Sequence, residues 1–347
     1  MLLKDKIDRL IEASMQKHDV PGLFITIVNQ DGLLFNGAYG CRDRETGAAM
    51  DENTLVYTAS ITKAFTALSC ALLVEQKKLA WDTPLLELVP SFKTADAYIT
   101  KNATIVDLLS HRTGIAEFPL IGQDGVTRAD VFAALKNNAP NRPFRAAWQY
   151  NNCMYAVAGH IVELLSGQAW EDFVQARIFA PLGMADSDFA FVFGWPPENR
   201  SKLYEMRDDS VAPLESPAVP VNQHDTWNPA GSVNSNAIDM SKWLAFWLGV
   251  GEPLLSKENF DMLTAPHCIT EMRPDTGGEH FSTACYGLGW VTQWYKGRHA
   301  VWHNGSFGAY VSFLPEEQLG IAVVPNMNSP LGQSVTYEIC DLLSKID

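Results

Sequence analysis

Basic residues are scarce in this chain of 347 residues. It holds 26 Lys and Arg against 40 Asp and Glu, a formal net charge of −14. The longest basic run is the pair Lys77 and Lys78. Surfaces that bind nucleic acid or anionic membranes need clustered Lys and Arg. The charge balance therefore argues against both kinds of partner.

Long apolar runs and paired cysteines are lacking as well. No run approaches the ~20 apolar residues of a membrane-spanning helix, and the N-terminus, MLLKDKIDRLIEASMQKHD, has no apolar signal core. The six cysteines show no Cys-x-x-Cys spacing, which indicates reduced thiols rather than a disulfide framework or a zinc site. We expect no metal, no cofactor and a cytoplasmic location, although a trimmed exported protein would show the same pattern.

Strand patterns lie at both ends of the chain and helical patterns lie between them. Residues 4–18 have an amphipathic helical period, and GLFITIVNQDGLLFNGAYG (22–40) is typical of two strands around a turn. Four more strand patterns fall within 286–328, and a final helix follows. The proline-rich residues 192–230 are expected to be irregular.

This order predicts an α/β (α+β) fold: an antiparallel sheet built from both termini, flanked by helices, with an inserted all-helical lobe. We assign residues 1–90 and 275–347 to the sheet domain and residues 91–274 to the mostly helical domain. The active site is expected between the two, where ligand pockets tend to occur.

The stretch VYTASITKAFTALSCALLVE (56–75) is typical of a buried helix that opens with a Ser-x-x-Lys pair. In the first turn of a helix, free N–H groups and the dipole would favour negative charge on Ser60. Lys63 lies one turn on, and its apolar neighbours disfavour the charged amine, which could then take part in proton transfer. An N-cap role for Ser60 or Thr58 is the structural alternative.

The spacing alone is weak, because Ser14 and Lys17 repeat it on the N-terminal helix. Two stretches further along change the interpretation. Tyr150-Asn151-Asn152 precedes a helical pattern, and His303-Asn304-Gly305, followed by Ser306, ends a strand pattern. A lone Tyr or His at such a position is more often structural than catalytic. Three short patterns in this order are far more specific than any one of them.

Together these patterns resemble the serine β-lactamase-like family, which includes class C β-lactamases, D-alanyl-D-alanine carboxypeptidases (penicillin-binding proteins), D-amino-acid amidases and a branch of bacterial esterases. LLSHRTGI (108–115) and PAGSVNS (229–235) are similar to two further family patterns. The resemblance extends from about residue 8 to the C-terminus.

The resemblance implies acyl transfer through a covalent acyl-enzyme. Ser60 would be the nucleophile, with Lys63 and Tyr150 sharing the proton transfers in a division that the sequence leaves open. Substrate binding is implied for Asn152, His303, Gly305 and Ser306, with the backbone N–H groups of Ser60 and Ser306 forming the oxyanion hole.

The third motif departs from the β-lactamase pattern, in which a Lys and a hydroxyl residue help to hold a carboxylate. Here His303 and Asn304 occupy those positions, so efficient β-lactam hydrolysis is not expected. We predict a hydrolase of a small ester, amide or short peptide. The alternatives are an acyltransferase, a weak β-lactamase and a catalytically silent penicillin- or peptide-binding sensor.

Several other polar and aromatic residues have plainer interpretations. His160 and Glu163 lack a second His at the metal-binding spacing and are interpreted as helix surface, and His111 as a structural residue that holds a loop near the active helix. Four tryptophans near the motifs could line a pocket, although core packing is favoured for each: Trp148, Trp227, Trp290 and Trp302.

Overall fold

The computed structural model describes residues 2–189, 199–214, 225–272 and 278–344. Its main element is a nine-stranded antiparallel sheet in the order β3-β2-β1-β13-β12-β11-β10-β9-β8. The strands are β1 (Gly22–Asn29), β2 (Gly32–Asp43), β3 (Ala48–Ala49), β8 (Cys268–Ile269), β9 (Cys285–Tyr286), β10 (Val291–Tyr295), β11 (Arg298–Asn304), β12 (Tyr310–Leu314) and β13 (Leu319–Pro325). The predicted antiparallel sheet built from both ends of the chain is confirmed.

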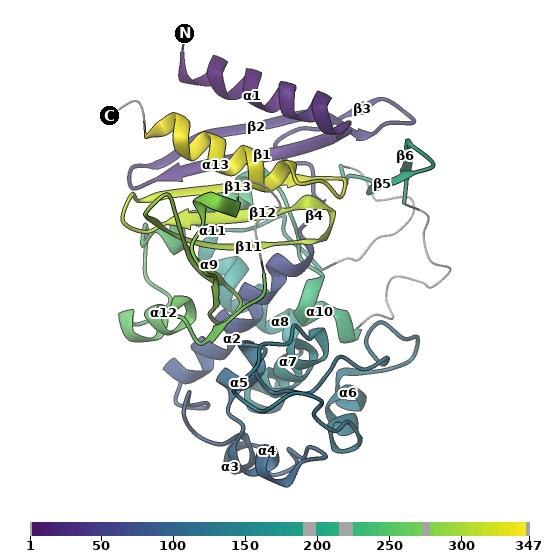
Figure 1. Cartoon of the computed structure of the whole chain (residues 1–347), viewed down its shortest axis with the longest axis vertical. Helices are drawn as coiled ribbons and strands as arrows, with labels where there is room; N and C mark the ends of the chain where they lie inside the picture. Colours follow the sequence, from purple (N-terminus) through teal and green to yellow (C-terminus); the bar gives the residue numbers. More distant parts are fainter. Residues whose placement is uncertain (1, 190–198, 215–224, 273–277, 345–347) are drawn as a thin grey trace.

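The two central strands are buried almost throughout because helices cover both faces of the sheet. β1 pairs with β13 from Leu23 opposite Pro325 to Asn29 opposite Leu319, and both strands are rich in β-branched residues. The helices α1 (Leu3–His18) and α13 (Leu331–Leu343) lie together on one face, and α11 (Ala237–Trp247) lies on the other (Figure 1). Both termini therefore lie at the same end of the molecule.

The remaining helices gather below the sheet around α2 (Figure 1). Residues 62–73 of α2 are all buried, so this helix is hydrophobic all round and forms the centre of the larger hydrophobic core. The helices are α2 (Thr62–Glu75), α3 (Leu85–Leu88), α4 (Ala97–Asn102), α5 (Ile105–Leu109), α6 (Arg128–Ala134), α7 (Asn152–Ser166), α8 (Trp170–Val174), α9 (Ala180–Leu182), α10 (Asn228–Gly231) and α12 (Lys257–Thr264). The α/β fold class is thereby confirmed, whereas the domain boundaries at 90 and 275 stay a prediction.

The expectation of irregular structure over 192–230 is wrong in part. Residues 190–198 and 215–224 lie outside the described residues, but β5 (Tyr204–Arg207) and β6 (Ser210–Pro213) form a hairpin between them. Its two turn residues, Asp208 and Asp209, both have positive φ, as a two-residue hairpin turn of type I′ requires. Proline in the flanking sequence concealed this short strand pair.

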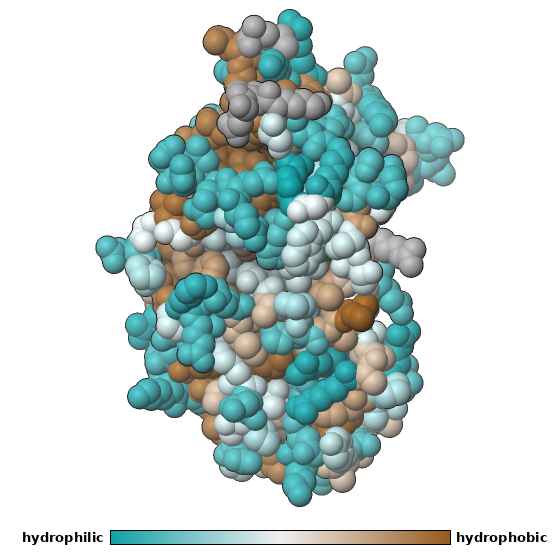
Figure 2. Space-filling model, turned by 60° about the vertical axis from the view of Figure 1, so that its left-hand side comes forward, coloured by the Kyte–Doolittle hydropathy of each residue, from teal (hydrophilic) through white to brown (hydrophobic). Residues whose placement is uncertain are grey.

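The surface is mixed in polarity. The face shown in Figure 2 is mostly hydrophilic, and hydrophobic residues interrupt it mainly near the end that carries the termini. In the described part of the chain, no helix is both long enough and apolar enough to cross a membrane.

A buried carboxylate fixes the loops that follow α5. Asp107 is fully buried and accepts hydrogen bonds from the Arg112 Nε atom at 2.7 Å and the Arg145 Nη2 atom at 2.7 Å. Arg112 also donates to the His267 carbonyl, so the cluster connects three separate segments. The hydrogen bonds of both arginines and of the Thr104 backbone lower the pKa of Asp107 against the opposing effect of burial.

We expect Asp107→Asn to lower the free energy of unfolding by about 3 kcal/mol at pH 7, because two guanidinium groups lose their counter-charge. Since the folded-state pKa is lowered, this stabilisation is present above the unfolded pKa of about 3.9 and is lost as the pH falls through the folded value. Urea unfolding at pH 7 and pH 3 tests both points, with the exposed Asp82→Asn as control. Equal stabilities of Asp107→Asn and Asp82→Asn at pH 7 would contradict the prediction.

Candidate active site

The segment that carries Ser60 is a 3-10 turn (Ala59–Ile61) that runs directly into α2. Ser60 thus lies just ahead of the α-helix rather than in its first turn. The Thr58 N–H and Oγ1 both donate to the Val233 carbonyl, at 3.0 and 2.7 Å, and no side-chain cap closes the turn or α2. The N-cap alternative for Thr58 is therefore wrong, and this side chain instead anchors the segment to the strand pair β4 (Val56–Tyr57) and β7 (Asn234–Ser235).

Lys63 is completely buried and directed at Ser60. Its Nζ atom donates to Ser60 Oγ at 3.1 Å, to Asn152 Oδ1 at 2.8 Å and to the Ala230 carbonyl at 2.7 Å. Burial lowers the pKa of Lys63 to about 7, with a smaller opposing effect from Glu117. A substantial fraction of Lys63 is therefore a neutral amine at neutral pH and can accept a proton from Ser60.

Tyr150 approaches Ser60 from the helical side of the site. Its hydroxyl donates to Ser60 Oγ at 2.9 Å, and its ring centroid lies 4.7 Å from Lys63 Nζ. Burial raises the pKa of Tyr150, and the hydrogen bond to Ser60 offsets only part of this shift. Tyr150 is therefore a neutral phenol at rest, which favours Lys63 as the proton acceptor.

His111 supports Tyr150 from behind. Its Nδ1 atom accepts a hydrogen bond from the Asn151 N–H at 3.1 Å, and its ring centroid lies 4.4 Å from that of Tyr150. Burial, together with the nearby Lys63 and His303, holds the pKa of His111 well below its usual value. This geometry agrees with the structural role expected for His111.

Asn152 is held from two sides. Its Oδ1 faces Lys63, while its backbone N–H and its Nδ2 atom both donate to Glu117 Oε2, at 2.8 and 3.0 Å. Sequence reasoning missed Glu117, because nothing in its local pattern distinguishes it from the other acidic residues. Only its position two residues after LLSHRTGI hints at a role in the site.

The side chain of His303, predicted to bind substrate, does not line the cleft. His303 is completely buried; its Nδ1 atom lies 2.6 Å from the Asn304 carbonyl, and its Nε2 atom lies 2.8 Å from the Tyr286 hydroxyl. Because a carbonyl only accepts, Nδ1 carries the proton and Nε2 accepts from Tyr286. Neighbouring strand residues point to opposite faces, so Asn304 reaches the cleft while His303 supports the chain behind it.

Gly305 allows the end of β11 to approach the Ser60 turn. A Cβ atom on Gly305 would lie 2.3 Å from the Thr58 carbonyl oxygen and 3.2 Å from Ala59 Cβ, so a larger residue would push the two segments apart. Ser60 and Ser306 consequently line the same cleft, an arrangement that supports the predicted pairing of their N–H groups.

The cleft above Ser60 has a volume of about 660 Å³, which suits a small-molecule ligand. Its lining combines aromatic and apolar side chains with hydroxyl and amide side chains. The residues that line it are Ser60, Trp148, Tyr150, Met272, Asn304, Gly305, Ser306, Gly308, Ala309, Tyr310, Asn328, Ser329, Pro330 and Gln333. Within the described ranges, none of these side chains carries a charge.

The four tryptophans separate into two groups. Trp148 both packs against the smaller core cluster and lines the cleft, so the core and pocket interpretations hold together for this residue. Trp290 and Trp302 are buried in the core, and Trp227 packs against the larger core cluster.

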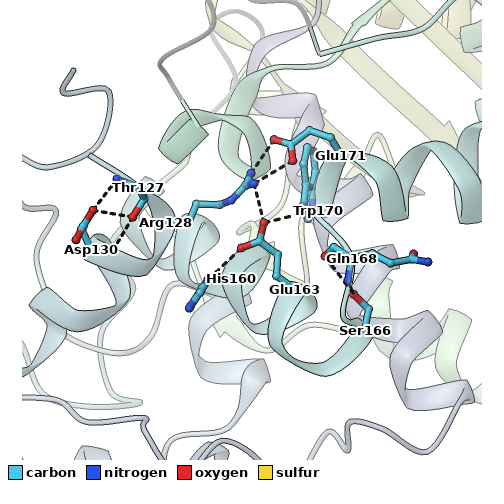
Figure 3. A network of polar contacts seen from close by, with 9 residues as sticks. All are labelled: Thr127, Arg128, Asp130, His160, Glu163, Ser166, Gln168, Trp170 and Glu171. Atoms are coloured by element: carbon cyan, nitrogen blue, oxygen red, sulfur yellow. Dashed lines mark hydrogen bonds and ion pairs between the residues drawn. The ribbon is translucent and has the colours of Figure 1, made fainter. Parts of the chain in front are cut away.

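The sequence pattern favours a helix surface for His160 and Glu163, but in the structure both side chains belong to a partly buried polar network. Glu163 accepts a hydrogen bond from Arg128 at 2.7 Å and one from His160 Nδ1 at 3.0 Å, and Arg128 also bonds Glu171 (Figure 3). Asn228, the first residue of α10, donates to Glu171 in turn. This partly buried network therefore joins α6, α7, α8 and α10, and in the described residues no cluster of three or more His, Cys, Asp or Glu could hold a metal ion.

Comparisons of the amino-acid sequence identify a family and related proteins. The family described as Beta-lactamase matches residues 7–339. The unguisins hydrolase ungD' of Aspergillus campestris is 29% identical over 350 residues, covering 96% of this chain and 64% of that protein. The chain thus spans less than two thirds of the length of this relative.

Solved structures show the same fold. The octameric penicillin-binding protein homologue from Pyrococcus abyssi has a TM-score of 0.81 and 25% identity, covering 99% of this chain and 78% of its own. EstCE1, a hydrolase with promiscuous acyltransferase activity, has a TM-score of 0.83 at 16% identity, with 98% and 97% covered.

Proposed function

The chain belongs to the Beta-lactamase family, and from that premise we propose that it is a serine hydrolase that cleaves an uncharged ester or amide through an acyl-enzyme. One observation carries the proposal: Ser60 Oγ lies within hydrogen-bond distance of both Lys63 Nζ and Tyr150 Oη at the cleft. A nucleophile in contact with two proton-transfer groups is the arrangement that acyl-enzyme chemistry needs.

In the acylation step, Ser60 Oγ attacks the substrate carbonyl carbon and its proton passes to the neutral Lys63 amine, 3.1 Å away. The backbone N–H groups of Ser60 and Ser306 stabilise the negative charge on the carbonyl oxygen, an effect of ~3 kcal/mol for each donor. Tyr150 donates its proton to the leaving group, and the proton on Lys63 then restores the phenol. Water repeats the sequence on the acyl-enzyme and releases the acid.

The substrate class follows from the cleft. An anionic substrate would gain no counter-charge from the described lining residues and would approach a chain with a net charge of −14. Amide and hydroxyl side chains (Asn304, Asn328, Ser329) can instead pair with neutral carbonyl and N–H groups, while Trp148 and Met272 offer an apolar surface. We infer a neutral acyl compound such as a simple ester, an amide or a short blocked peptide. The cytoplasmic location stays a prediction.

The proposal is tested by a matched pair of substrates. We expect a fluorophosphonate probe to label Ser60, as mapped by peptide mass spectrometry, and a neutral p-nitrophenyl ester to be hydrolysed. Its analogue with a carboxylate on the acyl chain, and the anionic β-lactam nitrocefin, should have kcat/KM values lower by about 100-fold or more, the cost of an unpaired charge in the cleft.

Absence of both labelling and turnover would contradict the hydrolase proposal and favour the alternative of a catalytically silent penicillin- or peptide-binding sensor. Equal kcat/KM values for the neutral and anionic esters would overturn only the substrate class. Product transfer to an added alcohol in place of water would identify an acyltransferase.

A further inference from the structure

Glu117 touches the site without lining the cleft. It lies on the loop after α5. Its Oε2 atom accepts hydrogen bonds from the backbone N–H and from the Nδ2 atom of Asn152, at 2.8 and 3.0 Å. The same loop is fastened to the start of α7 by Asn151 Nδ2, which donates to the Ile115 carbonyl at 2.7 Å, and by Cys153 Sγ, which contacts the Phe118 carbonyl at 3.3 Å. Glu117 is thus held in place from both sides.

This contact decides which way the Asn152 carboxamide faces. A carboxylate only accepts hydrogen bonds, so Nδ2 must turn toward Glu117 and Oδ1 toward the donor on the other side. That donor is Lys63 Nζ, at 2.8 Å. In the reversed orientation, Nδ2 would face Lys63, and the amine would lose one of the acceptors that aim it at Ser60.

Glu117 also adds a negative charge to a site in which Lys63 is the only other group that is charged near neutral pH among those named below. Among the described residues, the titratable groups around Lys63 and Tyr150 come from β4, the loop after α5, the residues that lead into α7, α7 itself, β9 and β11. They are Tyr57, His111, Glu117, Tyr150, Tyr155, Tyr286 and His303. Of this set, Glu117 alone is acidic. It raises the pKa of Lys63 in opposition to burial.

We propose that Glu117 is a positioning residue that acts through Asn152 and Lys63: it fixes the Asn152 carboxamide and sets the pH range in which Ser60 is acylated. This inference rests on the proposed function of Ser60 and Lys63. The simpler alternative is that Glu117 only caps α7, because an acidic group at a helix N-terminus is stabilising in any protein.

Two substitutions separate charge from geometry. Glu117→Gln keeps an acceptor for Asn152 but removes the charge, so the acid limb of the pH profile should move down by roughly 0.5 to 1 pH unit. Ser60 labelling at pH 6 should then be about three-fold faster than in the wild type. Glu117→Ala frees the carboxamide, and labelling should be slower at every pH.

The measurement is the rate of fluorophosphonate labelling of Ser60 between pH 5 and pH 9, at low salt and in 1 M NaCl. Salt screens an exposed carboxylate, so the difference between Glu117→Gln and the wild type should shrink in 1 M NaCl. Glu271→Gln is the matched control, because it removes an exposed carboxylate next to the cleft residue Met272 and contacts Arg142 rather than Asn152.

The outcomes are distinct. If the wild type is not labelled, the proposed function fails. If the wild type is labelled and Glu117→Gln changes only the thermal stability, with an unshifted pH profile, Glu117 is a helix cap and the inference is overturned. If Glu271→Gln shifts the profile equally, the effect is one of net charge and the inference is also overturned.

Discussion

Ser60→Ala is expected to abolish fluorophosphonate labelling and to lower kcat/KM for the p-nitrophenyl ester by at least about 1,000-fold. The substitution removes the oxygen that is hydrogen-bonded to both Lys63 Nζ and Tyr150 Oη. The fold should be unaffected, because Ser60 is only partly buried and the change removes a single oxygen. Labelling by mass spectrometry, steady-state kinetics and the Tm of both proteins check this expectation.

The chain carries its own control for this experiment. Ser14 and Lys17 share the Ser-x-x-Lys spacing on α1, so Ser14→Ala should label and turn over like the wild type. If Ser60→Ala were labelled as well as the wild type, the nucleophile would be misassigned. Loss of activity together with a large fall in Tm would instead indicate a structural role for Ser60.

Lys63→Met is expected to reduce the rate of Ser60 labelling by about 100-fold or more, the usual contribution of a positioned general base. The wild-type rate should rise with pH through about 7, the pKa of the buried Lys63 amine, and then level off, because the neutral amine is the active form. Lys63→Met should lose this acid limb. Labelling rates from pH 5 to pH 9 measure both effects, and Lys17→Met is the control on α1.

Tyr150→Phe separates the two proton transfers. p-Nitrophenolate leaves without a proton donor, whereas an anilide nitrogen must be protonated as it leaves. The variant should therefore keep kcat/KM for the ester, which reports acylation, within about 10-fold of the wild-type value and lower kcat/KM for the anilide by about 100-fold or more. A loss of labelling as large as in Lys63→Met would show that Tyr150 takes the Ser60 proton and would contradict the assignment of Lys63 as the base.

The architecture and the main candidates could be predicted from the sequence because their signals are local. Strand and helix periods depend on residues a few positions apart, and they correctly predicted the paired β1 and β2 and the final helix. Three short motifs in order indicated Ser60, Tyr150 and His303. The hairpin at 204–213 was missed, since its four-residue strands are too short to show a period among flanking prolines.

Only the tertiary structure decided how these residues work together, because the deciding contacts join distant parts of the chain. The two Ser-x-x-Lys pairs look alike in sequence, yet only Lys63 is buried and bonded to the Ala230 carbonyl, 167 residues away. That burial brings its pKa to about 7. Strand geometry turned His303 away from the cleft, and loop packing brought Glu117 to Asn152. The sequence by itself determined the fold and the residue types of the site, and long-range packing determined their protonation and their direction.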